Sequence, residues 1–350
     1  MHRVTVVSAI FNIVKAGRTK VFLKNLESVH NQTHDDIEHV VVDGGSTDGT
    51  LKILEKYAKK GWIRYISEPD KGIYDAMNKG ARMGTGDYVA FLNSDDYWFD
   101  NRGVEYSVRA LLEQNADFSF APSYTTQDDF PRHKCETSIG NFFLRMPFCH
   151  QTMFTRRDVF LKLGAYDIEN FRSAGDFHFI QRLILSGHKP AYVGHNFTAY
   201  SHGGFSAVDM ETSNLECIKA MHMEFSKFYP EFTKEDADRA FRTHTISEQF
   251  LRVMIPKIDP LISSQLLALP KDYIEVGKTE SGEVKYDVKF KLYPYSHAIS
   301  SADFAPGSSW KLYYRCGKLF GFPLFSRTDT VEKSVFKILG IPVWTARSGK

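Results

Sequence analysis

The chain has 350 residues, of which 43% are apolar and 25% charged, which excludes a disordered protein and allows a sizeable core in one large domain or two. Its net charge of +2 gives no indication of a nucleic-acid partner. Four widely spaced cysteines without a CxxC pair, and no run near the roughly 18 apolar residues of a membrane span, predict a cytoplasmic protein with reduced thiols.

The first hundred residues alternate between strand and helix patterns. Short apolar runs predict four strands, at Val4–Ile10, up to Asp43, at 62–66 and at 88–92. Apolar residues three or four positions apart predict helices through 22–29, over 48–60 and over Ile73–Met83. This rhythm is typical of βαβ units in a mostly parallel sheet, whose right-handed crossovers bring the loops after the strands to one edge. We therefore predict an α/β fold with a ligand site at that edge.

Helical patterns dominate after residue 100. We expect helices near 104–112, 157–163, 176–186, 211–228 and 233–254, with a mixed pattern over 117–155. Thr233 and Asp236 form a capping box at the start of the last of these helices. Because Pro256 and Pro260 break the pattern, we predict a main domain over 1–255 and an accessory tail over 256–350.

The tail contains a two-copy repeat, since 318–326 and 337–345 match position by position at an offset of 19 residues. Apolar runs split by Gly-x-Pro predict paired β segments, and two copies are too few for a solenoid. Eight Lys and Arg residues against Asp329 and Glu332 give 311–350 a charge of +6. Such a basic, aromatic tail favours contact with a membrane surface, and a small β unit packed on the main domain is the alternative.

The loop after the 88–92 strand holds two adjacent carboxylates, Asp95 and Asp96. Neighbouring carboxylates repel each other unless a cation lies between them. Hard oxygen ligands suit Mg²⁺ or Mn²⁺, which bind one or two carboxylates plus substrate phosphates. The alternative is that Asp95 caps the next segment and Asp96 is solvated.

The segment SEPDKGIYDAMNKG at 67–80 is a second candidate site. Lys71 and Gly72 stand just before a predicted helix, whose first N–H groups favour a phosphate. Asp75 and Asn78 share one face of that helix. Neither a P-loop nor a dinucleotide-binding motif occurs in the chain.

Three segments together, VDGGSTDGT at 42–50, SEPDKGIYDAMNKG at 67–80 and FLNSDD at 91–96, resemble the inverting family-2 glycosyltransferases with the GT-A fold. The resemblance is to the branch that builds bacterial surface polysaccharides, and it covers about residues 3–206. It implies a Rossmann-like, mostly parallel sheet with C-terminal helices. It also implies transfer of a sugar from a nucleotide-sugar donor to a lipid-linked oligosaccharide acceptor at the cytoplasmic face of the inner membrane. Because the Gln-x-x-Arg-Trp motif of processive synthases is absent, we expect one sugar per turnover.

Carried over by position, the resemblance implies which residues bind the donor. They lie at the ends of the first two predicted strands, before and within the helix Ile73–Met83, and in the loop after the 88–92 strand, and they are Ala9, Phe11, Asn12, Asp43, Asp70, Lys71, Gly72, Asn78, Asn93, Ser94 and Asp96. Asp43 would contact the base. Asp95 would bind Mn²⁺ or Mg²⁺, and His202 in the HGGFS loop at 202–206 would reach the metal or a phosphate. The Asp-x-Asp signature of the family reads Asn93-Ser94-Asp95 here, so Asp96 would supply the missing charge.

The same resemblance implies the catalytic and acceptor-side residues. Asp176 in AGDF at 174–177 would take the proton from the acceptor hydroxyl, which inverting transfer requires of a general base. Its alternative role is that of an N-terminal helix cap. His150 and Gln151 in CHQ at 149–151 match an acceptor-side motif, against the alternative of a structural histidine.

Two other functions stay open at this point. A sugar-1-phosphate nucleotidyltransferase would need a glycine-rich basic loop after the first strand, and residues 11–15 have no glycine. A catalytically inactive glycan-binding or scaffold protein of the same fold would explain why Asn93 replaces a carboxylate.

Overall fold

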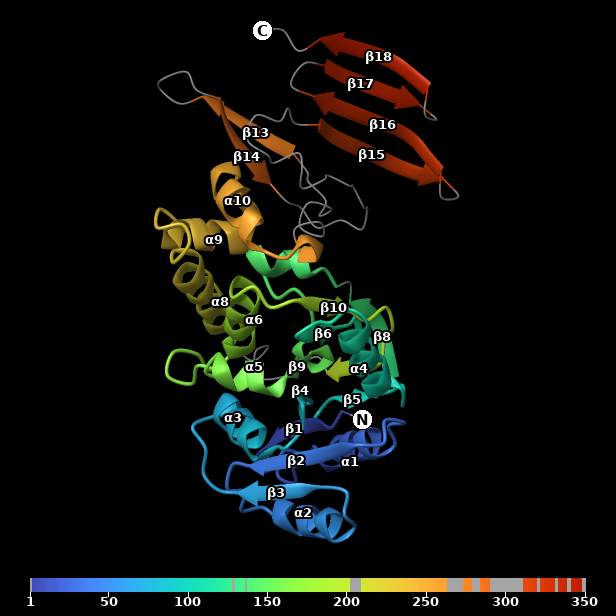
Figure 1. Ribbon diagram of the computed structural model, residues 1–350, viewed down its shortest axis with the longest axis vertical. Helices are drawn as coiled ribbons and strands as arrows, with labels where there is room; N and C mark the ends of the chain where they lie inside the picture. Colours follow the sequence, from blue (N-terminus) through green and yellow to red (C-terminus); the bar gives the residue numbers. More distant parts are fainter. Residues whose placement is uncertain are drawn as a thin grey trace. The chain divides into compact units, whose positions relative to one another are not determined.

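The structure, a computed structural model, describes residues 2–127, 130–135, 137–201, 209–262, 273–278, 284–289, 311–319, 322–330, 333–338 and 341–347. The chain divides into two compact units (Figure 1). The first comprises Met1–Thr137 with Arg145–Glu224, and the second comprises Ser138–Leu144 with Phe225–Lys350. No helix in these described ranges is long and apolar enough to cross a bilayer.

The first unit is built on a seven-stranded sheet in the order β10-β6-β9-β4-β1-β2-β3. Its strands are β1 (Val4–Ile10), β2 (Ile37–Asp43), β3 (Arg64–Ser67), β4 (Tyr88–Phe91), β6 (Phe118–Phe120), β9 (Phe154–Arg156) and β10 (Pro190–Tyr192). Neighbours run parallel, except that β9 is antiparallel to both β4 and β6. This mixed, mostly parallel sheet confirms the predicted fold class.

A smaller sheet in the same unit has the order β5-β11-β7-β8. Its strands are β5 (Tyr97–Trp98), β7 (Ser123–Gln127), β8 (Phe130–Cys135) and β11 (Thr198–Ser201). The helices of the unit are α1 (Thr19–His30), α2 (Thr50–Lys59), α3 (Ile73–Met83), α4 (Gly103–Glu113), α5 (Arg157–Lys162), α6 (Gly175–Leu185) and α8 (Met210–Phe225). A short 3-10 helix, η2 (His150–Thr152), precedes β9.

The core explains why the strands are so apolar. All seven residues of β1 are buried, as are Val40 to Val42 in β2, because helices cover both faces of a parallel sheet. Gly80 lets α3 approach β1 closely, since a Cβ atom there would lie 2.3 Å from a methyl group of Val7.

The strand register decides where the loops emerge. Ile10 pairs with Asp43 and Asp43 pairs with Ser67, while Val7 pairs with Phe91 on the other side of β1. The loops after β1, β2, β3 and β4 therefore leave the sheet at the same carboxyl edge, as the βαβ pattern predicted.

The second unit combines η1 (Ile139–Phe143), α9 (Lys234–Thr243), α10 (Glu248–Met254) and η3 (Ile255–Lys257) with β strands. A three-stranded sheet in the order β12-β14-β13 contains β12 (Thr245–Ser247), β13 (Tyr273–Lys278) and β14 (Val284–Lys289). An antiparallel meander contains β15 (Lys311–Leu319), β16 (Phe322–Thr330), β17 (Lys333–Ile338) and β18 (Ile341–Arg347). The predicted β pairing of the repeat is thereby confirmed.

Two expectations about 233–254 have different outcomes. The capping box is present, because Thr233 accepts the N–H of Asp236 while the Asp236 carboxylate accepts the N–H of Thr233. The single long helix is wrong, because His244 adopts a left-handed φ of +56° and ends α9. Phe225, Phe232 and Phe250 pack together, and α9 and α10 belong to the second compact unit. The proline pattern had instead predicted a boundary after these helices.

Candidate active site

The loops after β1 and β2 are tied to each other. Asn12 adopts a left-handed φ of +46°, which asparagine tolerates better than most residues. Its backbone N–H donates to Ser46 Oγ at 2.7 Å, and its side-chain oxygen accepts the N–H of Thr47 at 3.0 Å. The preceding residue, Phe11, is 53% exposed. Asn12 thus orders the loop and Phe11 presents a ring at the carboxyl edge, while Ala9 is buried within β1.

Asp43 ends β2 and is fully buried. Its carboxylate accepts the N–H groups of Gly45 at 3.2 Å and Ser46 at 2.8 Å, and the hydroxyls of Ser46 and Ser67, the latter at 2.6 Å. Asp43, expected to contact the nucleotide base, therefore organises the βα loop from within.

Asp70 lies against the same loop. A Cβ atom at Gly44 would lie 2.5 Å from Asp70 Oδ2 and 3.3 Å from the ring of Phe11, so a larger residue at position 44 would have to displace the Asp70 side chain. Burial raises the pKa of Asp70, and the charges of Asp75 and Asp43 add to this effect. Asp70 Oδ1 accepts the N–H of Gly72 at 2.8 Å. This bond fixes the turn into α3.

Lys71 and Asn78 lie in different environments, one exposed and the other buried. The Lys71 ammonium lies 3.3 Å from Glu169, and both side chains are exposed, so Lys71 is available at the surface near the start of α3. Asn78 is buried, donates to the carbonyl of Tyr166 at 2.8 Å and accepts its N–H at 3.0 Å. Asn78 thereby fastens α3 to the segment before α6, a structural role within the expected donor-binding set.

The loop after β4 is held by Asn25, which α1 buries beside it. Asn25 Nδ2 donates to the carbonyls of Asn93 at 2.8 Å and Asp96 at 3.0 Å. Asp96 is buried and accepts the N–H of Ser201 at 2.7 Å and the side-chain amide of Gln151. Burial raises the pKa of Asp96 well above its ordinary value, and the neighbouring charge of Asp95 adds to this. Ser94, which precedes the two carboxylates, is also buried.

The oxygen donors left at this loop suit a divalent cation. The Asp95 side chain is 22% exposed, with Arg18 at 3.8 Å. The side-chain oxygen of Asn93 is buried and has no hydrogen-bond partner among the described residues. Nowhere in those residues do three His, Cys, Asp or Glu side chains form a group able to hold a metal. The donor set fits an ion that completes its ligands with substrate phosphates. His202, the other expected contact, lies outside the described residues.

Asp176 lies in the first turn of α6 and pairs with His150. The distance from His150 Nδ1 to Asp176 Oδ2 is 3.0 Å, and each side chain is 12% exposed. The other oxygen, Oδ1, accepts the Tyr74 hydroxyl and the N–H of Phe177, both at 2.9 Å. Burial alone would raise the pKa of Asp176, but the hydrogen bond and charge of His150, with the bonds from Tyr74 and Phe177, outweigh it and hold the pKa below its ordinary value. Asp176 is therefore an ionised carboxylate, suited to supporting proton removal.

A path of contacts connects these groups. Asp43 belongs to the loop whose Gly44 packs on Asp70, and Asp70 fixes the turn into α3. Tyr74 of α3 bonds Asp176, which pairs with His150. Gln151, the next residue in η2, bonds Asp96. The structure thus brings the aspartates at 43, 96 and 176 to one edge of the first unit.

Three contributors were missed from the sequence: Asn25, Tyr74 and Glu216. Glu216 of α8 accepts the N–H groups of Arg172, Ser173 and Ala174 and so orders the segment that leads into α6 and Asp176. A signal existed for Asn25, because it lies on the apolar stripe of Phe22, Leu26 and Val29, where a buried amide is unusual.

Comparison with known proteins shows the family and the fold. The sequence profile of glycosyl transferase family 2 matches residues 11–164. A PGL/p-HBAD biosynthesis glycosyltransferase of Mycobacterium bovis (strain BCG / Pasteur 1173P2) is 32% identical over 180 residues, covering 51% of this chain and 67% of the relative. A chondroitin synthase of Escherichia coli is 40% identical over 115 residues, 33% of this chain and 16% of that protein. The crystal structure of S. aureus TarS 1–349 in complex with UDP-GlcNAc shares the fold, with a TM-score of 0.54 and 18% identity over 73% of each chain.

Proposed function

Since this chain belongs to glycosyltransferase family 2 and is a glycosyltransferase with the GT-A fold, we propose that it transfers one sugar, with inversion, from a nucleotide-sugar donor to an acceptor hydroxyl. The acceptor we propose is a lipid-linked oligosaccharide of a surface polysaccharide, reached at the cytoplasmic face of the inner membrane. The basic aromatic tail supports the membrane contact.

One observation carries this proposal: η2 joins the donor-side loop to the candidate base. Gln151 bonds Asp96 in the loop after β4, and the preceding His150 pairs with Asp176 at 3.0 Å. Two groups with separate tasks in a displacement reaction, holding the diphosphate and removing a proton, are thus fixed relative to each other by adjacent residues. Such fixed positioning is a principal source of rate enhancement.

The residues of the chain then divide the reaction between them. The Asp176–His150 pair takes the proton of the acceptor hydroxyl as its oxygen attacks the anomeric carbon from the face opposite the diphosphate. The first N–H groups of α3 would hold a phosphate of the donor, because a helix N-terminus favours an anion, while Asp75 and Asp70 accept the N–H groups of Lys71 and Gly72. Asp95 and Asn93 would hold Mg²⁺ or Mn²⁺, which supplies charge stabilisation for the leaving diphosphate.

A donor panel tests this function. Purified full-length chain with Mn²⁺ is offered UDP-, GDP- and dTDP-sugars, with UDP-GlcNAc first because TarS was crystallised with it. We expect thermal stabilisation by a matching donor and slow release of nucleoside diphosphate, accelerated by an oligosaccharide acceptor. Stabilisation without release would identify a binding protein. Consumption of a nucleoside triphosphate with a sugar 1-phosphate would identify a nucleotidyltransferase, and no response to any donor would contradict the proposal.

A further inference from the structure

The Asp176 carboxylate is surrounded by donors from within the protein. Its Oδ2 accepts from His150 Nδ1 at 3.0 Å, and its Oδ1 accepts from Tyr74 and from the backbone N–H of Phe177, both at 2.9 Å. Burial keeps Tyr74 protonated, because it raises the pKa of this phenol well above its ordinary value. Both oxygens of Asp176 therefore already accept hydrogen bonds from positioned protein groups before any acceptor arrives.

In His150, by contrast, only one of the two ring nitrogens has a hydrogen-bond partner among the described residues. An ionised carboxylate only accepts hydrogen bonds, so Nδ1 of His150 carries the proton it donates to Asp176. In a neutral ring, Nε2 then keeps its lone pair. This atom is buried and finds no hydrogen-bond partner within the part of the chain that the structure describes. A buried polar atom without a partner calls for an explanation, and an absent ligand is one.

We propose, resting on the glycosyltransferase function above, that His150 Nε2 is the atom that accepts the proton of the acceptor hydroxyl, and that Asp176 orients the ring. As the acceptor oxygen forms its bond to the anomeric carbon, its O–H proton passes to Nε2. The bond between that carbon and the diphosphate oxygen breaks, and its electron pair leaves with the nucleoside diphosphate. The imidazolium is stabilised by Asp176 and later releases its proton to solvent. This is the division of labour of a carboxylate–histidine pair in acyl transfer.

Few charges surround the ring. The strands that pack against η2 are β4, β6 and β11, and their sequences contain no Asp, Glu, Lys, Arg or His. Asp96 lies behind Gln151, and Tyr74 contacts Asp176. Cys217 is close enough for the charge of Asp176 to raise the pKa of its thiol, which burial raises most. Asp176 is therefore the charged group paired directly with His150.

A double-mutant cycle tests the assignment with the donor found in the panel. His150→Asn keeps an amide donor near the position of Nδ1 but leaves no base at Nε2, so kcat should fall by about 10²–10⁴-fold. The thermal shift produced by the donor should stay the same. Asp176→Asn should cost a similar factor, and the double variant should lose little more than either single one, because the two residues act as a unit. His188→Asn, which disrupts a matched histidine–aspartate pair with Asp117 at 3.2 Å, should keep its kcat within about twofold.

Retention of more than about a tenth of kcat by His150→Asn would show that Asp176 takes the proton directly and would overturn the proposal. The proposal would also be overturned if the loss of kcat in the double variant equalled the product of the losses in the two single variants.

A second measurement does not depend on activity. In the ¹⁵N-histidine-labelled full chain, the ring resonances of His150, identified by their loss in His150→Asn, should show a protonated Nδ1 and a bare Nε2 at pH 8. A proton on Nε2 with a bare Nδ1 would overturn the proposal even if donor and acceptor were unknown. Failure of the glycosyltransferase function itself would instead appear as a wild-type protein that releases no nucleoside diphosphate.

Discussion

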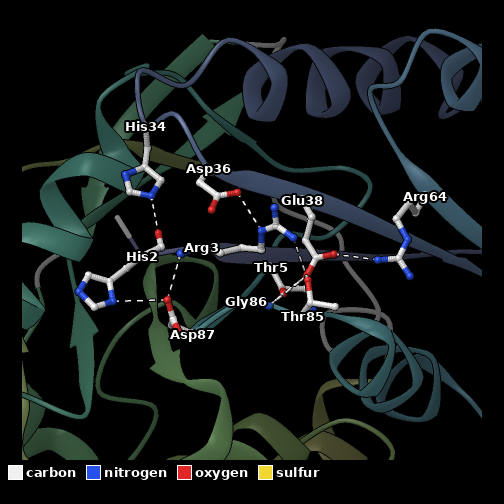
Figure 2. Close-up of polar contacts among 10 residues, drawn as sticks. All are labelled: His2, Arg3, Thr5, His34, Asp36, Glu38, Arg64, Thr85, Gly86 and Asp87. Carbon is white, nitrogen blue, oxygen red and sulfur yellow. Dashed lines mark hydrogen bonds and ion pairs between the residues drawn. The ribbon is translucent and has the colours of Figure 1, made fainter.

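At the amino edge of the main sheet the polar side chains bond one another, whereas at the carboxyl edge two buried polar atoms lack a partner among the residues described. Figure 2 shows the amino edge. Glu38 of β2 accepts the hydroxyl of Thr5 at 2.7 Å, the N–H and hydroxyl of Thr85, and the N–H of Gly86 at 3.1 Å. Its other oxygen pairs with Arg64 at 2.9 Å.

The rest of that edge follows the same rule. Arg3 bonds Asp36 at 2.8 Å and the hydroxyl of Thr85 at 3.1 Å, while its backbone N–H donates to Asp87. His2 also reaches Asp87, at 3.4 Å (Figure 2). Each charge thus has an opposite charge or a hydrogen-bond donor beside it. These polar groups hold the strand ends in place by bonding one another rather than a ligand.

The carboxyl edge is built from similar residue types but is left incomplete. Asn93 Oδ1 and His150 Nε2 are both buried, and neither has a hydrogen-bond partner in the described ranges. The Asn93 side chain hydrogen-bonds Asp96, and His150 precedes Gln151 in the sequence. Both residues therefore flank the hydrogen bond between Gln151 and Asp96. Polar composition alone does not separate a functional edge from a structural one. The carboxyl edge differs in that two buried polar atoms without a partner in the described part of the chain lie there, beside the candidate donor loop and the candidate base, whereas the charges at the amino edge are paired.

The largest effect should come from removing a carboxylate at the incomplete edge. Asp95→Ala should lower kcat/KM for the donor in Mn²⁺ by about 100-fold, or about 2.7 kcal/mol, because it removes a ligand for the ion that bridges to the diphosphate. The matched control is Asp87→Ala, a carboxylate at the opposite edge (Figure 2), which should leave donor kinetics unchanged. Titration of activity against Mn²⁺ gives the measurement, and an unaltered Mn²⁺ dependence in Asp95→Ala would remove this residue as a ligand.

The second effect, on stability, should come from the complete edge. Glu38→Ala leaves the N–H groups of Thr85 and Gly86 without their acceptor, and losing such partners should cost about 1–3 kcal/mol of unfolding free energy. Donor kinetics of the folded protein should not change. Asp158→Ala is the control, because its pair with Lys162 is exposed and should be worth less than about 1 kcal/mol. Urea denaturation of the three proteins measures the difference, and equal losses in both variants would mean that the Glu38 hydrogen bonds contribute no more than an exposed ion pair.

The pattern of apolar residues predicted this fold well where the elements are long. The run Val4–Ile10 and the helix Ile73–Met83 were predicted with the bounds they have, because an uninterrupted apolar run and a helical period each specify a buried face. The sequence pattern did not define the elements within 117–155. Three of them, β6, β9 and η2, have three residues each, which is too few to show a strand or helix period. The helix over 233–254 failed at His244, where a local left-handed residue interrupts a pattern that continues across it.

The residues of the candidate site likewise differ in how far local sequence predicts them. Asp95, His150 and Asp176 could be predicted as candidates because they stand in recognisable segments at the ends of strands and helices. Their supporting partners were not, because the bond between Tyr74 and Asp176 joins residues 102 positions apart. Likewise, nothing local to Asp43 shows that the hydroxyl of Ser67, on the next strand, occupies its carboxylate. Local patterns identify candidate groups, and only the fold decides which of their atoms stay unoccupied.

The smallest effect concerns His39, which lies on β2 between the two edges and contacts Ser8 Oγ at 3.0 Å. Burial lowers the pKa of His39 to about 3, so the folded protein keeps this ring neutral while the unfolded chain takes up a proton near its ordinary pKa of 6.5. The stability that His39 contributes is therefore complete above pH 6.5. It should be lost by about 1.4 kcal/mol for each pH unit as the pH falls from there toward 3. Urea denaturation at pH 7.5, 6.5 and 5.5 should show this slope in the wild type and in His30→Gln, whose histidine is exposed. The slope should be weaker in His39→Gln, and an identical slope there would mean that His39 is charged in the folded protein.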